Sequence, residues 1–328
     1  MLQRALRRPG PARSLSVLGE RHKSLGRRIR EHAWCYVFIA PAVVLYLMFT
    51  VWPVLASWYF AFFDWSGLGA PTRFVGLANF QEVVTNSYFW NAFKHSFQFM
   101  AGLVVLQLPT TLIMAIILNN SRLKAASVYR VIFFLPVVTT TAIVGIVMTY
   151  IFSPFNGVVN TILVRSGLLD KPVHFLGQAS TALLTIIVVS AWKGFGTNMM
   201  YWLAGLQAIP NEVYEAAKVD GASTVQTFFR ITVPLIRPVG LVIILFTVVG
   251  ALRVFDLVKV MTDGGPFFLT ETISIFIYRY AFGSAGMPRI GFASAAGIFF
   301  GLAAMILSTI QGLAIRKGGS IGARGGTQ

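Results

Sequence analysis

Charged side chains are scarce in this sequence, and their scarcity excludes a water-soluble globular protein. Only 12% of the 328 residues are charged, whereas 56% are hydrophobic, and the mean hydropathy is +0.71. A soluble domain covers its surface with roughly 25–35% charged residues. The composition therefore indicates a chain that is integral to a membrane.

Cysteine is almost absent too: Cys35 is the single one, which excludes an internal disulfide and a cysteine-rich metal site. The four histidines, His22, His32, His95 and His174, lack the spacing of metal ligands. No GxxxxGK[ST] motif is present, so the chain has no P-loop for ATP. Its apolar runs also lack paired carboxylates and any nucleophile–histidine arrangement. These absences disfavour a membrane enzyme and predict no catalytic residue, no metal and no cofactor bound by this chain.

Six apolar runs are long enough to cross a bilayer, which takes roughly 20 residues of helix. We expect spans near Ala33–Phe60, His95–Leu118, Val131–Phe152, Thr181–Leu206, Val239–Val260 and Gly291–Ile315. Prolines inside them are tolerated in transmembrane helices and often kink them. The expectation is an all-α integral membrane protein with six transmembrane helices in residues 33–315, a basic N-terminal tail (1–32) and a C-terminal tail (316–328).

Basic residues are distributed unevenly between the two sides of these spans. The side with the termini carries 18 Lys or Arg, nine of them in residues 1–30, and the other side carries 7. Cytoplasmic segments carry the excess of Lys and Arg. The formal net charge of +16 therefore indicates membrane topology and not nucleic acid binding. We expect a multi-pass cell-membrane protein with both termini cytoplasmic and the basic tail near anionic lipid.

A cleavable signal peptide is the alternative interpretation of the N-terminus. The apolar run that begins near Ala33 is too long for one, and no convincing small-residue cleavage site follows it.

The stretch Gly205–Pro238 is the longest polar interruption between apolar runs in the second half. Pro210 suits the first position of a helix, and Gly221 suits the left-handed residue that ends one. Ser223 with Gln226 is typical of a capping box that starts the next helix. The prolines at positions 234 and 238 are expected to mark the entry into the following apolar run. The pattern predicts a short helix, a sharp glycine turn and a second short helix on the cytosolic side.

This stretch resembles the EAA loop of permease subunits of binding-protein-dependent ABC importers. The matching positions are Glu215, Ala216, Ala217, Asp220, Gly221, Ala222, Phe228, Ile231 and Pro234. In that family the loop contains a coupling helix that docks in a cleft of the cytoplasmic ATPase. The resemblance implies this coupling role for residues 209–238; an ordinary amphipathic hairpin is the alternative.

Two outer segments extend the resemblance to carbohydrate importers of the maltose, lactose and glycerol-phosphate type. Phe74–Phe80 is similar to the FVGLxNY signature of one of their permeases, and Phe255–Phe282, which contains Gly264-Gly265-Pro266, is similar to their segment after span five. The resemblance covers about residues 33–315 and implies the type I ABC importer permease architecture. It also implies a second homologous permease subunit, a cytoplasmic ATPase dimer that binds the ATP, and an extracytoplasmic solute-binding protein.

The resemblance implies import of a mono- or oligosaccharide, with a phosphorylated polyol such as glycerol 3-phosphate as the alternative. A self-contained secondary carrier is a further alternative. Such a carrier should show internal repeats or a coupling carboxylate at the midplane, and the sequence has neither.

Polar residues inside the apolar runs are the candidates for a translocation cavity. A lysine at the centre of a membrane helix costs roughly 3 kcal/mol on translocon scales, so Lys193 in span four is not expected to face lipid. In span five, Arg253 and Asp256 are three residues apart and are expected to pair on one helical face. The full set of cavity candidates is Trp192, Lys193, Asn198, Tyr201, Arg253 and Asp256. The alternative for each charged residue is a structural bond to its own or a partner helix.

Overall fold

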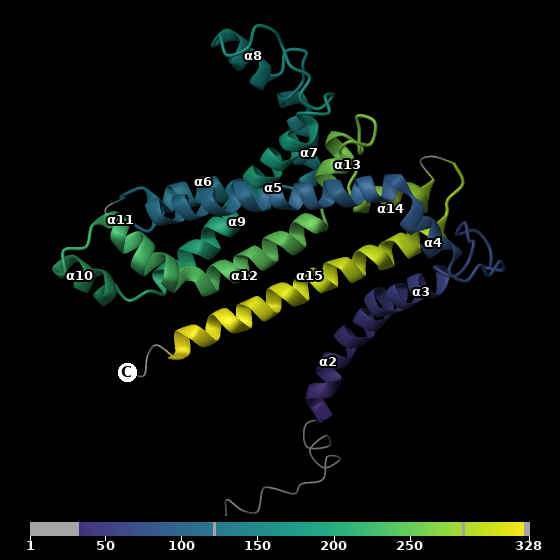
Figure 1. Cartoon of the computed structure of the whole chain (residues 1–328), viewed down its shortest axis with the longest axis horizontal. Coiled ribbons are helices and arrows are strands. Elements are labelled where there is room, and N and C mark those ends of the chain that lie inside the picture. The colour runs from purple at the N-terminus through teal and green to yellow at the C-terminus, as the bar shows by residue number, and fades with distance from the viewer. Residues whose placement is uncertain (1–32, 121–122, 284–285, 325–328) are drawn as a thin grey trace, which may run out of the picture. The chain divides into compact units, whose positions relative to one another are not determined.

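A computed structural model describes residues 33–120, 123–283 and 286–324, and the regular structure in these ranges is helical (Figure 1). The expected basic tail, residues 1–32, lies outside the described residues. The first helices are α2 (Ala33–Tyr46), the π-helix η2 (Leu47–Val51), α3 (Trp52–Phe60), α4 (Ala78–Thr85), α5 (Ser87–Leu118), α6 (Ala126–Val138), α7 (Thr141–Ile151) and α8 (Val158–Arg165). They are followed by α9 (Ala182–Gln207), α10 (Asn211–Val219), α11 (Thr224–Thr227), the π-helix η3 (Phe228–Thr232), α12 (Val233–Leu252), α13 (Asp256–Met261), α14 (Ile273–Phe282) and α15 (Ile290–Arg324).

Among the described residues, five helical runs are long and apolar enough to cross a membrane. They are Ala33–Phe60, Ser87–Leu118, Ala182–Gln207, Thr224–Leu252 and Ile290–Arg316. The third expected span, Val131–Phe152, is not one helix but the pair α6 and α7, which are bent by 99°. The number of spans is six if this bent pair counts as one.

The bend between α6 and α7 has a local cause. Pro136 cannot donate a backbone hydrogen bond inside α6. Thr139 and Thr140 both have extended backbones, with ψ of 146° and 139°. The Thr139 hydroxyl donates to the Pro136 carbonyl at 2.7 Å and so satisfies an acceptor at the helix end. A hydroxyl that competes with the helical ladder in this way favours a break.

The second span begins earlier than its apolar pattern indicated. The Asn86 side chain caps α5 by accepting from the backbone N–H groups of Tyr88 (2.9 Å) and Phe89 (3.2 Å). The helix therefore starts at Ser87, eight residues before His95. An asparagine cap satisfies orphan N–H groups at a helix start, so polar residues are carried into the first turns.

The chain divides into two compact units, residues 1–56 and 57–328. None of the described residues in the helical run Ala33–Phe60 is buried. The π-helix η2 ends at Val51, two residues before Pro53, where a wider turn leaves room for a ring without an N–H.

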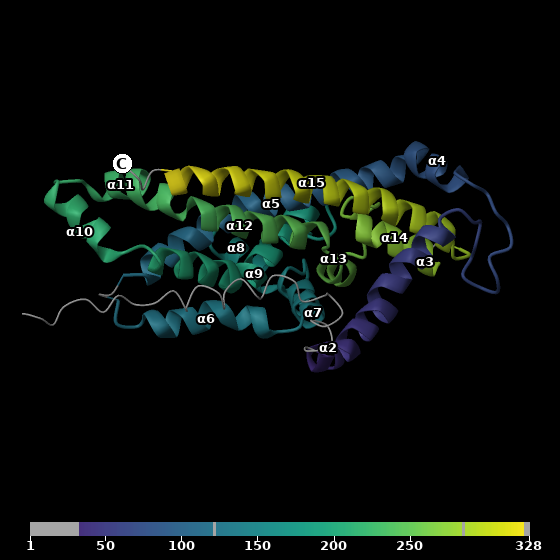
Figure 2. The same cartoon turned by 90° about the horizontal axis from the view of Figure 1, so that it is seen from below.

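Within the second unit, α5, α9, α12 and α15 run alongside one another (Figures 1 and 2). Small residues bring these helices close together. A Cβ on Gly196 of α9 would lie 2.5 Å from the Phe133 carbonyl oxygen of α6, and one on Gly240 of α12 would lie 2.8 Å from the Trp202 ring. Close backbone approach at small residues is typical of helix packing in membranes.

The hairpin of α10 and α11 lies at one end of this bundle, and α4 and α14 lie at the other (Figure 2). At the α4 end, buried aromatic and small residues of α4, α5, α14 and α15 form one cluster that includes Phe89, Phe276 and Phe292. Asn79 is buried there and donates to the carbonyl oxygens of Ala61 and Phe63, both at 2.9 Å. The asparagine of the FVGLxNY-like segment thus fixes the chain that enters α4.

Candidate functional site

The predicted glycine turn between α10 and α11 is confirmed. The helix α10 ends in a Schellman motif, in which the Ala222 N–H donates to the Ala217 carbonyl (2.9 Å) and the Gly221 N–H donates to the Lys218 carbonyl (3.1 Å). Gly221 has a φ of +73°, a left-handed conformation that glycine adopts without steric cost. At the other end of α10, Pro210 is the N-cap and not the first helical residue as expected.

The predicted capping box is also confirmed. The Ser223 hydroxyl accepts from the Gln226 N–H (3.3 Å), and the Gln226 side-chain oxygen accepts from the Ser223 N–H (2.8 Å). Two orphan N–H groups at the helix start are satisfied reciprocally. The turn is therefore specified on both sides by local hydrogen bonds.

The second helix of the hairpin is not short, and the expected boundaries of span five are wrong. A single helical run extends from Thr224 to Leu252 in place of the expected Val239–Val260. The π-helix η3 allows this, because the Val233 N–H reaches back five residues to the Phe228 carbonyl. The wider turn accommodates Pro234, whose ring would clash with the preceding turn of a regular α-helix. The coupling candidates are thus continuous with a membrane span.

The nine EAA-like residues divide by exposure. Ala217 is buried, and Ala222, Phe228 and Ile231 are half-buried, whereas Glu215, Ala216, Asp220, Gly221 and Pro234 are exposed. The motif therefore has an inner part that packs the hairpin and an outer part that faces away from the bundle.

Apolar side chains that the motif does not include accompany its outer part. Val219, Val225 and Phe229 are 88%, 65% and 64% exposed. We call these three residues the apolar rim of the hairpin. Sequence reasoning missed them as site residues, although Val225 and Phe229 stand on the apolar face of the second helix. An exposed apolar patch next to polar residues marks an interaction surface.

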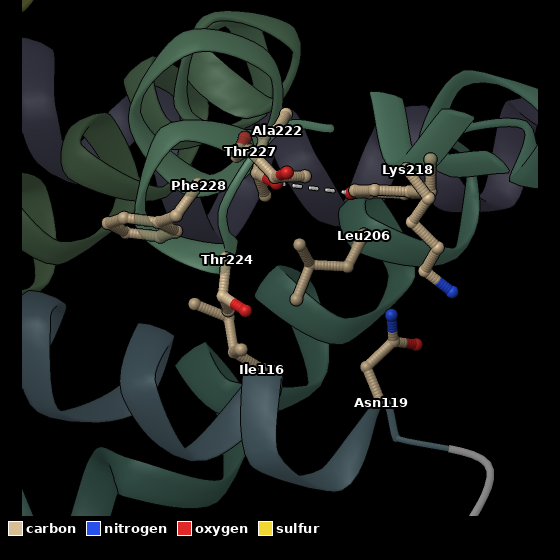
Figure 3. Close-up of a pocket in the computed structure, with 10 residues that line it drawn as sticks. Ile116, Asn119, Leu206, Lys218, Ala222, Thr224, Thr227 and Phe228 are labelled. Atoms are coloured by element: carbon tan, nitrogen blue, oxygen red, sulfur yellow. Dashed lines mark hydrogen bonds between the residues drawn. The ribbon is translucent and has the colours of Figure 1, made fainter. Parts of the chain in front are cut away.

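A pocket of about 290 Å³ lies between the hairpin and the ends of α5 and α9 (Figure 3). Ile116, Leu206 and Phe228 form its apolar wall. The Thr232 hydroxyl donates to the Tyr214 hydroxyl at 3.4 Å and connects η3 to α10 across it. The hairpin thus contacts the bundle through a few side chains, and the pocket between the hairpin and the bundle is not filled by this chain.

Lys193 lies near the middle of α9 and is half-buried. Within the described residues it forms no ion pair and no side-chain hydrogen bond. At intervals of three or four residues, Ser190, Lys193, Thr197 and Tyr201 share one face of the helix. The Ser190 hydroxyl oxygen is buried without a partner among the described residues. We call these four residues the polar face of α9; Ser190 and Thr197 were not among the sequence candidates.

The other two candidates in α9 lie elsewhere. Asn198 is buried, and its side-chain amide donates to the Thr247 hydroxyl of α12 at 3.0 Å. This bond between helices is the structural alternative that the sequence left open. Trp192 is exposed on a different face of α9 from Lys193.

The expected pair of Arg253 and Asp256 does not form. Arg253 is the C-cap of α12 and Asp256 begins α13, so the chain turns between them and the helical spacing is lost. Arg253 instead lines a groove of about 420 Å³ between α12 and α15, with Ser274 and Ser308. Asp256 is exposed at the start of α13.

Comparison with known proteins finds a family whose sequences match most of this chain. Residues 107–317 match the family described as binding-protein-dependent transport system inner membrane component. The matched range contains the hairpin, the polar face of α9 and the bent pair.

Curated relatives match over most of the chain. The probable ABC transporter permease protein YurN of Bacillus subtilis is 34% identical over 84% of this chain and 94% of its own. The lactose transport system permease protein LacF of Rhizobium radiobacter is 32% identical over 90% of this chain and 97% of its own. The trehalose/maltose transport system permease protein MalF of Thermococcus litoralis is 34% identical over 77% of this chain and 85% of its own.

A solved structure shares the fold. It is a chain of a bacterial ABC transporter involved in the import of the acidic polysaccharide alginate, which aligns with a TM-score of 0.77 and 26% identity over 90% of this chain and 99% of that chain. A second crystal structure, of a bacterial alginate ABC transporter in complex with an alginate-bound periplasmic protein, aligns with the same TM-score.

Proposed function

Because the chain belongs to the family of binding-protein-dependent transport system inner membrane components, we propose that it is the permease subunit of an ABC importer for a mono- or oligosaccharide. The observation that carries the proposal is the hairpin. Within the matched range, a rigid turn presents Ala216, Gly221 and the apolar rim away from the bundle. The surface fits a protein partner that covers it.

We propose that this partner is a cytoplasmic ATPase subunit, one of two that bind and hydrolyse ATP. The helical run from Thr224 to Leu252 would then connect the docked turn to the membrane without a break. A movement of the ATPase can shift the spans only if the hairpin makes different contacts in the two states. The pocket beneath the hairpin and the single Tyr214–Thr232 bond leave α10 room to change its angle.

The polar face of α9 is our candidate for the solute path. Relatives are named for the transport of lactose and of trehalose or maltose, and the solved relative imports alginate. Hydroxyl groups of Ser190 and Thr197, the Lys193 ammonium and the Tyr201 ring offer the donors, acceptors and aromatic surface that bind a sugar. A second, related permease subunit would close the path opposite this face.

The proposed orientation places both termini and the hairpin in the cytosol, on the basis of the 18 to 7 distribution of Lys and Arg. A periplasmic or extracellular binding protein would deliver the solute to the opposite side. Catalysis by the chain itself is not part of this function. The names of the relatives favour sugars over glycerol 3-phosphate.

Copurification and uptake test the proposal together. The chain should copurify with an ATPase and a second permease, and vesicles of the complex with its binding protein should accumulate a sugar only when ATP is present on the hairpin side. Tags placed before Leu2 or after Gln328 should be inaccessible to reagents outside intact cells, whereas a tag at Gly69 should react with them. Purification without any ATPase, or uptake without ATP, would contradict the proposed function.

A further inference from the structure

A second pocket, whose lining mixes polar and apolar side chains, lies on the side of the molecule away from the hairpin. It has a volume of about 460 Å³, within the roughly 300–1,000 Å³ of small-molecule sites. It has three walls: the end of α7 with the turn after it (149–155), the segment 174–177 before α9, and the end of α13 with the turn that follows (261–266). The helices α7 and α13 pack on each other beneath it (Figure 1).

Two of these walls are fixed to each other by one buried side chain. Asn160 of α8 is 2% exposed, and its amide donates to the carbonyl oxygens of Ser153 and Val173, both at 2.9 Å. Its carbonyl accepts from the Val173 N–H at 2.8 Å. Three of the four hydrogen bonds that this amide can form therefore hold the two walls at a fixed separation.

The third wall is fixed independently. The Thr270 hydroxyl, which is buried, donates to the Gly265 carbonyl at 2.6 Å and is 2.8 Å from the Thr262 hydroxyl. Gly264 completes the turn with a φ of +86°. Buried polar groups that are fully used to shape a concave surface make that surface rigid before any ligand arrives.

The lining is uncharged and combines hydrogen-bonding groups with apolar ones, such as Leu176 and Met261. It contains no Asp, Glu, Lys or Arg. Phe152 and Phe155 contribute aromatic rings, and Phe155 is 86% exposed. His174 lines the pocket with both ring nitrogens free of hydrogen bonds to the described residues, so one can donate and the other accept. The hydroxyls of Thr149 and Ser153 retain lone pairs that can accept.

We propose that this pocket is a carbohydrate subsite on the outer side of the permease, which holds one sugar ring by stacking on Phe155 and by hydrogen bonds to His174. The inference rests on the proposed function, because the sugar is the solute of the importer. It goes beyond that function by assigning a site outside the polar face of α9. An uncharged lining suits a neutral sugar and does not suit a phosphorylated polyol, whose charge would lack a partner there.

Cysteine protection tests the site in the assembled transporter. Cys35 is the natural cysteine of this chain and is replaced first by Cys35→Ser. His174→Cys is then introduced, and the complex in vesicles is labelled with a membrane-impermeant maleimide, with and without lactose, maltose, trehalose or arabinobiose. The same sugars are first screened for uptake by the Cys35→Ser complex.

A sugar that the complex imports should slow the labelling of His174→Cys by about tenfold once about 90% of the sites are occupied. Lys171→Cys, at an exposed position three residues before His174 that does not line the pocket, is the matched control and should label at an unchanged rate. If no sugar is imported by the control complex, the proposed function fails. If a sugar is imported but gives no protection, or if His174→Cys does not label even without sugar, only the subsite fails.

Phe155→Leu and Phe155→Tyr separate a sugar from a protein in this pocket. The leucine removes the aromatic ring, whereas the tyrosine keeps it. The sugar concentration that gives half-maximal protection should therefore be several times higher in Phe155→Leu and unchanged in Phe155→Tyr. Binding of sugar-free binding protein to the complex should be the same in both variants. Equal protection in both variants, or weaker docking of sugar-free binding protein to Phe155→Leu, would overturn the subsite in favour of a protein contact.

Discussion

The two ends of the second unit are held together in opposite ways. At the α4 end, where α14 also lies, Glu271 is 1% exposed and receives two hydrogen bonds from Arg279, at 2.7 and 3.1 Å. The Arg279 guanidinium also lies over the rings of Phe268 (4.5 Å) and Tyr280 (4.9 Å). Contacts between residues distant in sequence, such as Ser96 with the Ile273 N–H, tie this end to α5.

The hairpin end is built from local bonds. Its turn is fixed by the Schellman motif and the capping box, which join residues at most five positions apart. No ion pair forms among the described residues of the hairpin, and the apolar rim is exposed. The α4 end is thus held together by contacts between distant parts of this chain, whereas the hairpin end is shaped by local bonds and leaves its apolar rim exposed, as expected for a surface that another protein covers.

The largest difference between the ends should appear in stability. Arg279→Met leaves the buried Glu271 carboxylate without its partner and should lower the free energy of unfolding by about 3–5 kcal/mol. Arg230→Met, at an exposed and unpaired position of the hairpin, should change it by less than about 0.5 kcal/mol. Thermal unfolding of the complex in detergent measures the stability of both variants. Equal losses of stability would contradict the difference between the two ends.

The stability of Arg279→Met should also depend more strongly on pH than that of the wild type. Burial raises the pKa of Glu271 above its ordinary value, and the hydrogen bonds from Arg279 oppose that shift. Without Arg279 the folded state binds a proton more readily than the unfolded state, so stability should rise as the pH falls from about 7 to about 5. Glu271→Gln added to Arg279→Met should abolish this rise, and a rise that persists would assign it to another group.

The next effect concerns docking. Burial of a large apolar side chain contributes about 1.5–3 kcal/mol, so Phe229→Ser should weaken binding of the ATPase by about 10- to 100-fold. The unfolding temperature of the isolated chain should stay the same, because Phe229 is exposed. Phe267→Ser, at a 92% exposed phenylalanine of the α4 end, is the control. Should both variants bind the ATPase equally well, the apolar rim is not the docking surface.

The smallest effect should come from the polar face of α9, between the two ends. Lys193→Met removes a charged donor, a contribution of about 1.5–3 kcal/mol for a hydrogen bond to a charged group. Uptake at low solute concentration should fall by about tenfold, while assembly and basal ATP hydrolysis are retained. Asn198→Ala is the contrasting variant, because it breaks the bond to Thr247 and should lower stability instead. Loss of assembly in Lys193→Met would make the lysine structural.

Local chemistry at the hairpin could be predicted from the sequence. The glycine turn and the capping box depend on residues within a few positions of one another, and both are confirmed. The start of α5 at Ser87 was misplaced, because hydropathy does not record the Asn86 cap. The continuation of the helix from Thr224 into span five was missed, because hydropathy does not record a π-turn. Kinks at prolines were expected, but a 99° bend that divides the third span into two helices was not.

Pairings across the fold could not be read from spacing. Arg253 and Asp256 have helical spacing, but the helix ends between them. Glu271 and Arg279, which do pair, were not predicted, because they are eight residues apart and Glu271 precedes the start of α14. Of the four residues in the polar face of α9, Lys193 and Tyr201 were predicted and Ser190 and Thr197 were not. A lysine is conspicuous in an apolar run, whereas a serine or threonine there is not.

Gly221→Val tests the central claim, that the hairpin couples the spans to an ATPase. Apart from the two chain neighbours, no described residue has an atom within 4 Å of a Cβ at Gly221, so a Cβ added there meets no clash with the described part of the chain. Its cost is the left-handed backbone, a strain of about 1–3 kcal/mol, together with a β-branched side chain on the exposed turn. The measurement is ATP hydrolysis by the reconstituted transporter with and without its loaded binding protein. The account predicts that the complex inserts normally but that the binding protein no longer stimulates hydrolysis, and stimulation equal to that of the wild type would contradict it.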